Sequence, residues 1–449
     1  MNPDYLLTLP LAQQLYHDCA EHLPIIDYHN HLPAAQLGAD YHYANITQLW
    51  ISSDPYKHRA MRILGVPERL ITGDSTDYEK FRAWYTNLPR LIGNPLFDWS
   101  RMELSMVFGM ELLPFGDCEA VWNRLNEALA GMSAKDILDK FHIVYSAPCT
   151  ALTDDLSVFA QDPGLAPSLR GDDLLLPEKA LLQKLEGLTG CAISSLDAYI
   201  AAVNSRLEAF QLAGCRFTDH ALDNGFCYLP DDGGNEARFA SLLRGEAMSD
   251  RDALCLRSEI LTRLAGCYSG HGFTMQLHIG AQRTTSTRLR KLAGAAGGYA
   301  AIGSTADVRS LTAFLDAVEQ RSQGLPRVLL FPLNPADNAV MATLSGSYSA
   351  DDVEGLVSQG PAWWWCDHAQ GIRQMLETFS AHSVLSAFTG MTTDSRSILS
   401  FVRHDYFRRC LCQWMAEQVQ QERLPDDFVL LADTVRRICF ENANKRIGG

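Results

Sequence analysis

Short apolar runs that end in polar residues recur along this chain and predict strands buried in a parallel sheet. The first of them covers residues 23–33 and ends in two histidines one residue apart, His29 and His31. Similar runs follow at 141–147, 215–220, 273–280, 328–333, 362–367 and 385–393. Because stretches with helical spacing separate these runs, the pattern predicts an α/β fold, a (β/α)8 TIM-type barrel whose eighth strand lies in an irregular segment.

Other stretches lack a strand pattern. Residues 1–22 predict an amphipathic helix, and 37–140 predict a helical insertion near the N-terminus that covers the site like a lid. Residues 165–185 predict a loop followed by a helix, and 404–445 predict two helices with their charged residues outside. The Gly/Ala patch at 294–298 is typical of a mobile loop.

The composition is that of a globular protein with a sizeable core. Of the 449 residues, 47% are hydrophobic and 20% are charged, which fits one barrel domain over 1–449 that carries the insertion at 37–140. The formal net charge of −15 argues against nucleic acid or a membrane surface as a partner, because both require a basic face.

The chain carries no pattern of an export signal or a membrane anchor. Residues 1–15 lack the basic start and apolar core of a signal peptide, and no later run approaches the ~20 apolar residues of a membrane span. The twelve cysteines are scattered, so we expect reduced thiols and a cytoplasmic protein.

The histidine pair is the first candidate for chemistry. Residues i and i+2 of a strand point to the same face, so His29 and His31 can share one divalent metal, and imidazole nitrogen suits Zn²⁺. Two histidines in a loop after a strand would be the alternative, and a metal site needs further ligands from elsewhere in the chain.

Other strand ends supply such groups if the fold is a barrel, because its C-terminal rim gathers them. Asp394 follows the last run and, with the two histidine nitrogens, would supply the oxygen of a three-ligand metal site. The alternative is that Asp394 is the N-cap of a helix. His278 is a candidate substrate contact, with a buried core histidine as the alternative. Arg396 can hold a carboxylate, and the tryptophans at 363–365 can pack in the core or wall the pocket. The same rim is expected to hold Asp219 and His220.

A turn signal also marks residues 53–62, which combine polar and aromatic side chains. Asp54 and Pro55 are typical of a helix N-cap followed by the first helical position.

Taken together, these residues resemble a known family, the uronate isomerases (glucuronate isomerases) of the amidohydrolase superfamily. The motifs occur in order along nearly the whole chain: Asp27 before His29-Asn30-His31, Asp54-Pro55-Tyr56-Lys57 with Arg59-Ala60-Met61, Gly214-Cys215-Arg216 with Asp219-His220, Met275-Gln276-Leu277-His278-Ile279-Gly280, Leu333-Asn334-Pro335, Ala362-Trp363-Trp364, and Thr393-Asp394-Ser395-Arg396 followed by Arg403-His404 and Tyr406-Phe407-Arg408-Arg409.

The resemblance implies a distorted (β/α)8 barrel that interconverts D-glucuronate with D-fructuronate and D-galacturonate with D-tagaturonate. It implies metal ligands and pocket groups at these positions: His29, His31 and Asp394 for a divalent metal, with Zn²⁺ favoured, and Tyr56, Asp219, His278, Trp363 and Arg396 for the pocket.

Aldose–ketose exchange moves a proton from C2 to C1 through an enediol, with hydroxyl protons exchanged on the way. We therefore assign proton handling to Asp394 and Tyr56, a substrate oxygen anion to Arg396, and a hydroxyl or carboxylate to His278. The metal would stabilise the enediolate oxygens or orient the substrate.

One departure from the family bears on the substrate. Leu176 stands where the family pattern has an arginine that binds the sugar acid, and Arg170 is the candidate substitute, with a surface loop arginine as the alternative. A different acidic sugar is therefore an alternative substrate. A metal-dependent hydrolase or decarboxylase of the same superfamily and a non-catalytic sugar-acid binding protein are the competing functions, and a homo-oligomer is the expected assembly.

Overall fold

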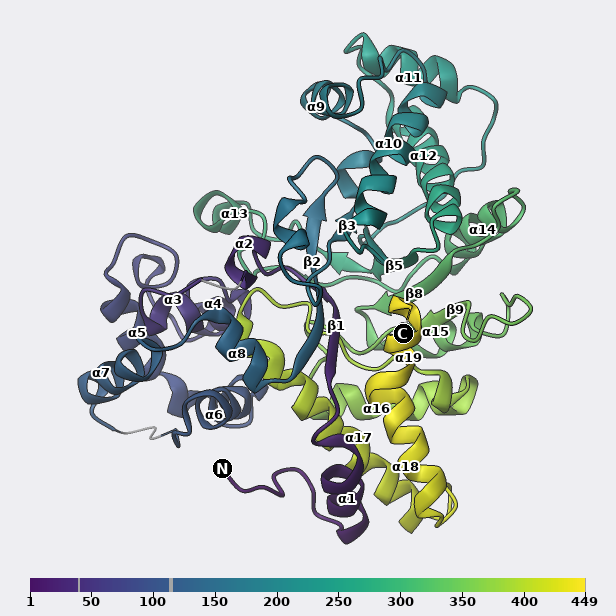
Figure 1. Cartoon of the computed structure of the whole chain (residues 1–449). Helices are drawn as coiled ribbons and strands as arrows, with labels where there is room; N and C mark the ends of the chain where they lie inside the picture. Colours follow the sequence, from purple (N-terminus) through teal and green to yellow (C-terminus); the bar gives the residue numbers. More distant parts are fainter. Residues whose placement is uncertain (39–40, 113–115, 449) are drawn as a thin grey trace.

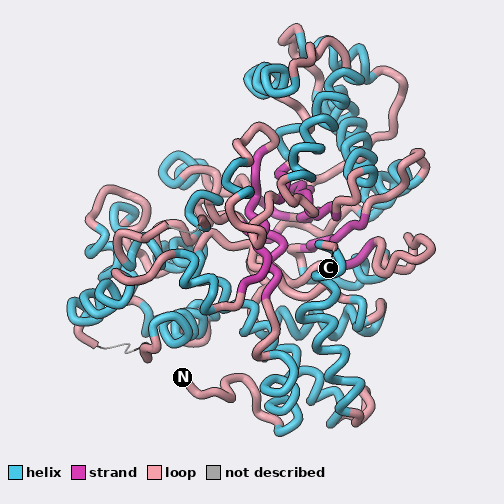
Figure 2. The backbone as a smooth tube through the Cα atoms, in the orientation of Figure 1, coloured by secondary structure: helices cyan, strands magenta, loops and turns pink. Residues whose placement is uncertain are grey.

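A parallel sheet with helices packed around it organises the chain (Figures 1 and 2). The computed structural model describes residues 1–38, 41–112 and 116–448. The sheet has seven strands, each parallel to its neighbours, in the order β1-β2-β3-β4-β5-β8-β9. Their bounds are Ile25–Asn30 (β1), Ile143–Ala151 (β2), Ser168–Arg170 (β3), Phe217–Leu222 (β4), Thr274–Ile279 (β5), Arg327–Pro332 (β8) and Val357–Gln359 (β9).

Alternation along the strands divides the core into two layers. In β8, Leu329 and Phe331 pack with Ile26 and Tyr28 of β1 inside the curled sheet. The next residues along, Val328 and Leu330, belong to the separate apolar cluster formed with the helices outside. Because both faces of the central strands are covered, β8 is apolar from Val328 to Pro332, as predicted for a parallel sheet, and the polar residues Asp219 of β4 and His278 of β5 are buried as well. The α/β fold class is confirmed.

The last run does not form the predicted strand. Residues 388–395 have no regular strand, yet they lie along the free edge of β1, where Asp394 N donates to His29 O at 3.0 Å and His31 N donates to Ser395 O at 2.7 Å. These residues do not form a regular strand because one bond of the ladder is made by a side chain: His29 N donates to the hydroxyl of Thr392 at 2.8 Å instead of to a backbone carbonyl. The prediction of a strand at 385–393 is therefore wrong in form, although the segment takes the expected place.

Two further strand predictions need correction. Residues 362–367 form a turn and not the predicted strand. The strand in this part of the chain is β9, which ends before the turn begins. Residues 165–185 contain β3 in addition to the expected loop and helix, and this short strand carries Arg170 at its C-terminal end. β3 is too short for a periodic pattern, so pairing with β2 and β4 decides it.

The described part of 37–140 is helical and contains no strand. It forms the lobe at the left of Figure 1. The elements from β1 to β2 are α2 (Ala34–Leu37), α3 (Ile46–Trp50), α4 (Pro55–Ile63), α5 (Asp77–Tyr85), α6 (Pro95–Phe108), α7 (Cys118–Leu129) and α8 (Ala134–Lys140), with short turns η2 (Glu68–Leu70) and η3 (Leu88–Leu91). As predicted, α4 begins with Asp54 as its N-cap and Pro55 as its first residue.

The other helices surround the sheet and extend both above and below it in Figure 1. They are α1 (Pro10–Leu15) with η1 (Tyr16–Ala20), η4 (Ser157–Ala160), η5 (Asp172–Leu174), α9 (Lys179–Thr189), α10 (Leu196–Leu212), α11 (Asn235–Leu243), α12 (Asp250–Gly270), α13 (Thr287–Ala293), α14 (Val308–Glu319), η6 (Pro335–Asp337), α15 (Asn338–Leu344), α16 (Ala369–His382), η7 (Leu385–Ala387), η8 (Ile398–Phe401), α17 (Val402–Gln420), α18 (Phe428–Arg436), η9 (Arg437–Glu441) and α19 (Asn442–Ile447). Two short strands, β6 (Ala281–Gln282) and β7 (Ala301–Ile302), pair antiparallel.

The termini also differ from expectation. The N-terminal helix covers only 10–20 of the predicted 1–22. The charged residues of α17 are buried instead of outside: Arg408 donates to the carbonyls of Leu23 and Pro24 at 2.9 and 2.8 Å, just before β1. Such backbone partners satisfy a buried guanidinium, which a sequence pattern does not reveal. Within the described ranges, no helix is both long and apolar enough to cross a membrane.

Candidate functional site

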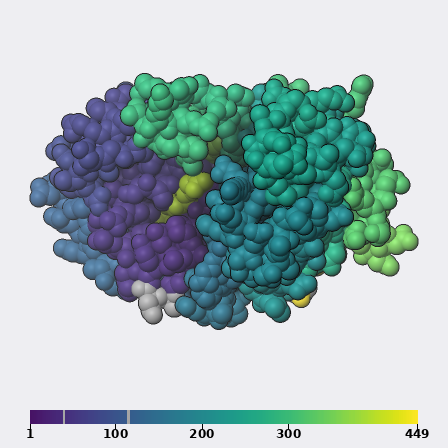
Figure 3. Space-filling view, turned by 90° about the horizontal axis from the view of Figure 1, so that it is seen from above, coloured from purple at the N-terminus to yellow at the C-terminus, as the bar shows by residue number. Residues whose placement is uncertain are grey.

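One pocket gathers nine of the residues singled out from the sequence. It has a volume of about 170 Å³. Figure 3 shows a hollow between the N-terminal part and the middle of the chain, with the yellow-green C-terminal third exposed inside it. The predicted residues that line the pocket are His29, His31, Tyr56, Arg170, Asp219, His278, Trp363, Asp394 and Arg396.

The two histidines of β1 converge on one carboxylate. Asp394 Oδ1 lies 3.2 Å from Nε2 of His29 and 3.1 Å from Nε2 of His31. Burial opposes ionisation of this carboxyl, but the hydrogen bonds from the two imidazoles hold its pKa well below its usual range. Asp394 has a φ of +48°, a left-handed conformation that side-chain-bearing residues rarely adopt and that is often found at functional sites.

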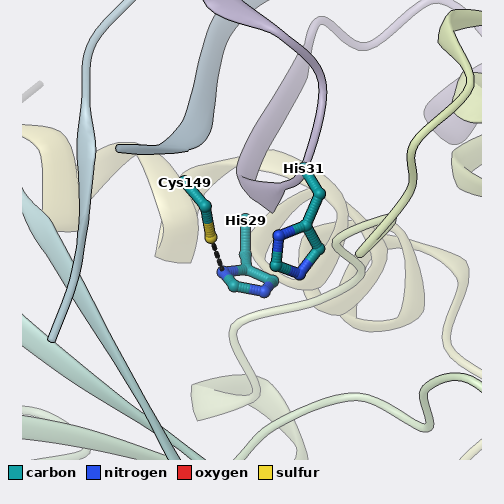
Figure 4. A group of neighbouring side chains, drawn as sticks. All are labelled: His29, His31 and Cys149. Carbon is teal, nitrogen blue, oxygen red and sulfur yellow. Dashed lines mark hydrogen bonds between the residues drawn. The ribbon is translucent and has the colours of Figure 1, made fainter. Parts of the chain in front are cut away.

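Cys149 is a neighbour of this cluster that no sequence motif pointed to. Its Sγ atom lies 3.8 Å from Nδ1 of His29 (Figure 4) and 3.9 Å from Asp219 Oδ2. Burial alone would raise the pKa of the thiol, but the charges of His31 and His29 lower it to about 6. The available signal was its position after the apolar run 141–147, since β2 runs on to Ala151 and carries Cys149 to the same rim.

A second acid and histidine pair lies beside the first. His278 Nδ1 is 2.6 Å from Asp219 Oδ1, while Nε2 of His278 is buried without a hydrogen-bond partner in the described structure. The His278 ring stacks on Phe331 and contacts Trp363 edge to face, with ring centres 4.6 and 4.7 Å away. Asp219 therefore fixes the ring of His278 and leaves one nitrogen for a ligand.

His220 does not share this rim. It is the next residue along β4, so its side chain points to the other face, where Nε2 lies 2.9 Å from the hydroxyl of Tyr268 on α12. The expectation that His220 joins the site is wrong for this reason.

Arginines supply positive charge at the pocket. Arg170 Nη2 bonds to Asp172 Oδ2 at 3.0 Å, and Nη1 lies 3.4 Å from Nδ1 of His31. The guanidinium of Arg396 has no hydrogen bond or ion pair to another described residue, and burial lowers its pKa. A partly buried, unpaired guanidinium favours an anionic ligand.

Leu176 lines a neighbouring cavity that Arg170 and Arg283 also line. The site therefore still has arginines, although leucine stands at position 176. Arg170 ends β3 and lines the pocket itself. The surface-loop alternative for Arg170 does not hold, because the pairing of β3 with β4 places residue 170 beside Asp219.

Tyr56 enters the pocket from the second position of α4. Its hydroxyl lies 3.3 Å from Asp367 Oδ2, and the guanidinium of Arg403 stacks on its ring at 4.2 Å. Burial and the charge of Asp367 raise the pKa of Tyr56 well above its usual value, so the phenol is protonated at neutral pH.

The Gly/Ala loop belongs to the site, which the sequence did not indicate. Ala295, Ala296 and Gly298 line the pocket. Gly298 has a φ of +80°, and a Cβ atom there would lie 2.3 Å from the carbonyl oxygen of Pro55. Only glycine fits this close approach, which joins the loop to the start of α4.

The donor atoms suit a divalent metal. Two overlapping groups place their ligand atoms within 4.8 Å of one another: His29, His31 and Cys149, and His29, Asp219 and His278. Asp394 contacts Nε2 of both β1 histidines. Imidazole nitrogen, carboxylate oxygen and thiolate sulfur are the ligands that Zn²⁺ takes in proteins.

Comparison with known proteins gives one family. A family model described as glucuronate isomerase matches residues 1–446. A uronate isomerase of Bacillus licheniformis is 36% identical over 456 residues, covering 99% of this chain and 96% of the relative. A uronate isomerase of Salmonella paratyphi B is 37% identical over 462 residues, covering 99% and 98%.

Solved structures share the fold. A uronate isomerase from Thermotoga maritima superposes with a TM-score of 0.91 at 24% identity, covering 99% of this chain and 98% of that one. A glucuronate isomerase from Caulobacter crescentus superposes with a TM-score of 0.89 at 22% identity, covering 100% and 96%. A putative metal-dependent hydrolase from Lactobacillus casei superposes with a TM-score of 0.52 at 11% identity, covering 95% and 96%.

Proposed function

This chain belongs to the glucuronate isomerase family, and on that premise we propose how its pocket carries out the reaction and on which sugars. It is an enzyme, an aldose–ketose isomerase of uronates. We propose D-glucuronate and D-galacturonate as substrates, with D-fructuronate and D-tagaturonate as the products.

One observation carries this proposal: the guanidinium of Arg396, which pairs with no described residue, lies in the same pocket as His29, His31 and Asp394. A uronate combines a carboxylate with neighbouring hydroxyl and carbonyl oxygens, so it requires cationic donors close to polar groups that handle protons. Besides Arg283, which also lines the pocket, Arg170 is a further cation there. We assign it to the carboxylate and Arg396 to the oxygen that becomes anionic during the reaction.

We infer that His29, His31 and Asp394 hold a divalent metal, and that Zn²⁺ is the favoured ion. The convergence of Asp394 on both Nε2 atoms supports this ligand set. When bound, a divalent cation polarises the carbonyl group and stabilises negative charge on the oxygens of the enediolate. Cys149 lies on the Nδ1 side of His29, so its role is to orient that ring.

The chain's own residues handle the protons. We propose that Asp394, which lines the pocket, takes the C2 proton and returns it at C1, and that Tyr56 exchanges a proton with a substrate hydroxyl. His278, oriented by Asp219, accepts a hydrogen bond from another hydroxyl through its free Nε2. Trp363 walls the pocket beside His278.

A metal-dependent hydrolase acting on another acidic sugar is the alternative. It would need the histidine pair and Asp394, with a water molecule as the nucleophile. The family match over 1–446 favours the isomerase, and the likeness to the Lactobacillus casei structure concerns the fold alone.

We also propose that the enzyme is cytoplasmic and that it self-associates. Each of the twelve cysteines, all within the described ranges, is a free thiol, as expected in a reducing compartment. Gel filtration with light scattering tests the prediction of a homo-oligomer.

The test of function is conversion of D-glucuronate and D-galacturonate by the purified protein, with and without added Zn²⁺. We expect ketose formation by the wild type and its loss in a His29→Asn/His31→Asn double variant. Tyr56→Phe should lower turnover by at least about tenfold while substrate still binds, since general acid–base groups contribute roughly 10²–10⁴-fold. Release of a hydrolysis product without ketose would contradict the proposal.

A further inference from the structure

Asp367 is a buried acid behind the pocket that the mechanism above does not use. It follows the three tryptophans at 363–365 and lies just before α16. Only 2% of its surface is exposed. Its Oδ2 atom lies 3.3 Å from the Tyr56 hydroxyl and 3.2 Å from Nη1 of Arg403. It therefore touches a pocket residue without lining that pocket.

Arg403 fixes this arrangement from α17. The same Nη1 atom donates to the carbonyl of Thr393 at 3.2 Å, one residue before Asp394. The guanidinium also lies over the rings of Tyr56 and Trp99 at 4.2 and 4.4 Å. Tyr56, Asp367 and the segment that carries Asp394 are thus held by one buried cation.

A second cavity lies on the other side of Tyr56. Tyr56 and Trp364 line both the substrate pocket and this cavity. Asp367 lines the second cavity but not the substrate pocket. The lining of the second cavity includes Ile63 and Ile92, which are 75% and 81% exposed to solvent. Water can therefore reach the neighbourhood of Asp367 without passing through the substrate pocket.

We propose that Asp367 is the proton acceptor of Tyr56, so that phenol and carboxylate form a relay between the substrate pocket and the second cavity. The inference rests on the proposed role of Tyr56. The carboxylate takes the proton of the Tyr56 hydroxyl while the phenol oxygen takes one from a substrate hydroxyl. Reverse transfer returns one proton to the substrate, so the cycle neither gains nor loses protons. Asp367 acts through Tyr56 and is a positioning residue.

The electrostatics of Asp367 suit exchange near neutral pH. Burial raises its pKa to about 6, although Arg403 and Arg59 oppose this. A carboxyl with a pKa close to the working pH gives and takes a proton most readily. Ionisable groups that face it from the elements packed around it are Tyr56 and Arg59 of α4, Arg403 and Tyr406 of α17, and Asp394.

The ionised form accepts the proton, so wild-type kcat should rise with pH through a midpoint near the Asp367 pKa of about 6. Asp367→Asn keeps the shape and one acceptor oxygen but cannot take a proton. We expect kcat to fall by roughly ten- to a hundredfold, KM to stay within about twofold, and the acidic limb of the kcat profile to disappear. Asp367→Glu should restore part of the activity together with the limb.

Asp337→Asn is the matched control. Asp337 is also buried, its pKa is also raised by burial, and it accepts from the backbone N of Ala306 away from the pocket. This variant should keep the wild-type profile. A wild-type kcat and an unchanged acidic limb in Asp367→Asn would overturn the relay.

Tyr56→Phe separates this inference from the proposed function and does not depend on folding of the Asn variant. If Asp367 acts through Tyr56, the residual activity of Tyr56→Phe should lack the limb near pH 6, and the Tyr56→Phe/Asp367→Asn double variant should be no slower than Tyr56→Phe alone. Additive losses would overturn the relay. Full turnover in Tyr56→Phe would show that Tyr56 takes no part in proton transfer, and the relay would fall with it. Loss of turnover in Tyr56→Phe together with wild-type kinetics in Asp367→Asn would overturn the relay but leave the proposed role of Tyr56 in place.

Discussion

Asp394 shows how much of the site depends on the conformation of single residues. Its φ of +48° turns the chain so that its N–H bonds to β1 while its carboxylate meets both histidines of that strand. A residue with a Cβ atom in this conformation costs of order 1–3 kcal/mol, and the bonds to β1 hold it there.

Arg170 is expected to set the preference for an acidic sugar. Arg170→Met removes a cation of the pocket whose side chain is 36% exposed. KM for D-glucuronate should therefore rise about ten- to a hundredfold, since a hydrogen bond to a charged group contributes roughly 1.5–3 kcal/mol. The matched neutral aldose, which lacks the carboxylate, should react equally well with the variant and the wild type. An equal loss for both sugars would assign Arg170 to general positioning.

Cys149 is expected to support metal retention. Its sulfur holds the Nδ1 side of His29 at 3.8 Å, and removing such a partner of a metal ligand typically weakens binding 10- to 100-fold. Cys149→Ala should therefore lose zinc to a chelator at a lower concentration than the wild type, as measured by metal content after dialysis. Cys191→Ala, at an exposed cysteine away from the pocket, is the control. Equal zinc content in all three proteins would contradict this role.

At the scale of elements, α4 links the helical lobe to the site. Its N-cap Asp54 accepts from the backbone of Tyr56, and its first residue, Pro55, contacts Gly298 of the pocket loop. Lys57 on the same helix is buried between Asp54 and Glu103, at 2.8 and 3.2 Å. The buried charges fix the orientation of α4 and so the position of Tyr56.

His58 of α4 should make stability depend on pH. Burial lowers its pKa to about 4, below the value near 6.5 of an unfolded chain. Between these two values the unfolded state takes up a proton that the folded state refuses, so the free energy of unfolding should fall by about 3 kcal/mol as pH drops from 6.5 to 4.

His58→Leu should remove that part of the slope, measured by urea denaturation at several pH values. His22→Gln is the control, because the side chain of His22 is 86% exposed. An unchanged slope in His58→Leu would show that His58 is not buried in its neutral form.

At the scale of the whole molecule, the seam between β1 and the segment before Asp394 closes the structure. Asp27 is fully buried there and joins three parts of the chain. It accepts from Thr393 N at 2.7 Å and from the Thr392 hydroxyl at 3.1 Å, and lies 3.0 Å from His404 Nε2 of α17. Residues more than 360 positions apart in sequence therefore meet at one carboxylate.

Asp27→Ala should destabilise the protein by about 3–5 kcal/mol, because it leaves several buried donors without an acceptor. Asp427→Ala is the control: this exposed N-cap of α18 should cost about 1 kcal/mol. Guanidinium denaturation measures both. A loss for Asp27→Ala no larger than that for Asp427→Ala would show that the seam does not close the fold.

The sequence by itself determined the features that depend on local geometry. The spacing of His29 and His31 places both on one face of a strand because side chains alternate. Asp54 and Pro55 mark the start of α4 because an N-cap acts within three residues. The order of the motifs named the family, and nine of the residues selected for the site line one pocket, whereas His220 lies on the other face of β4.

Tertiary structure decided what depends on partners far away in the chain. β3 exists because two neighbours pair with it, and residues 388–395 take the place of an eighth strand through side-chain hydroxyls. Cys149, the loop at 294–298 and Asp367 reached the site region through packing between distant segments. The buried charges of α17 have the polarity of a surface helix in sequence, and only their backbone and side-chain partners explain why they lie inside.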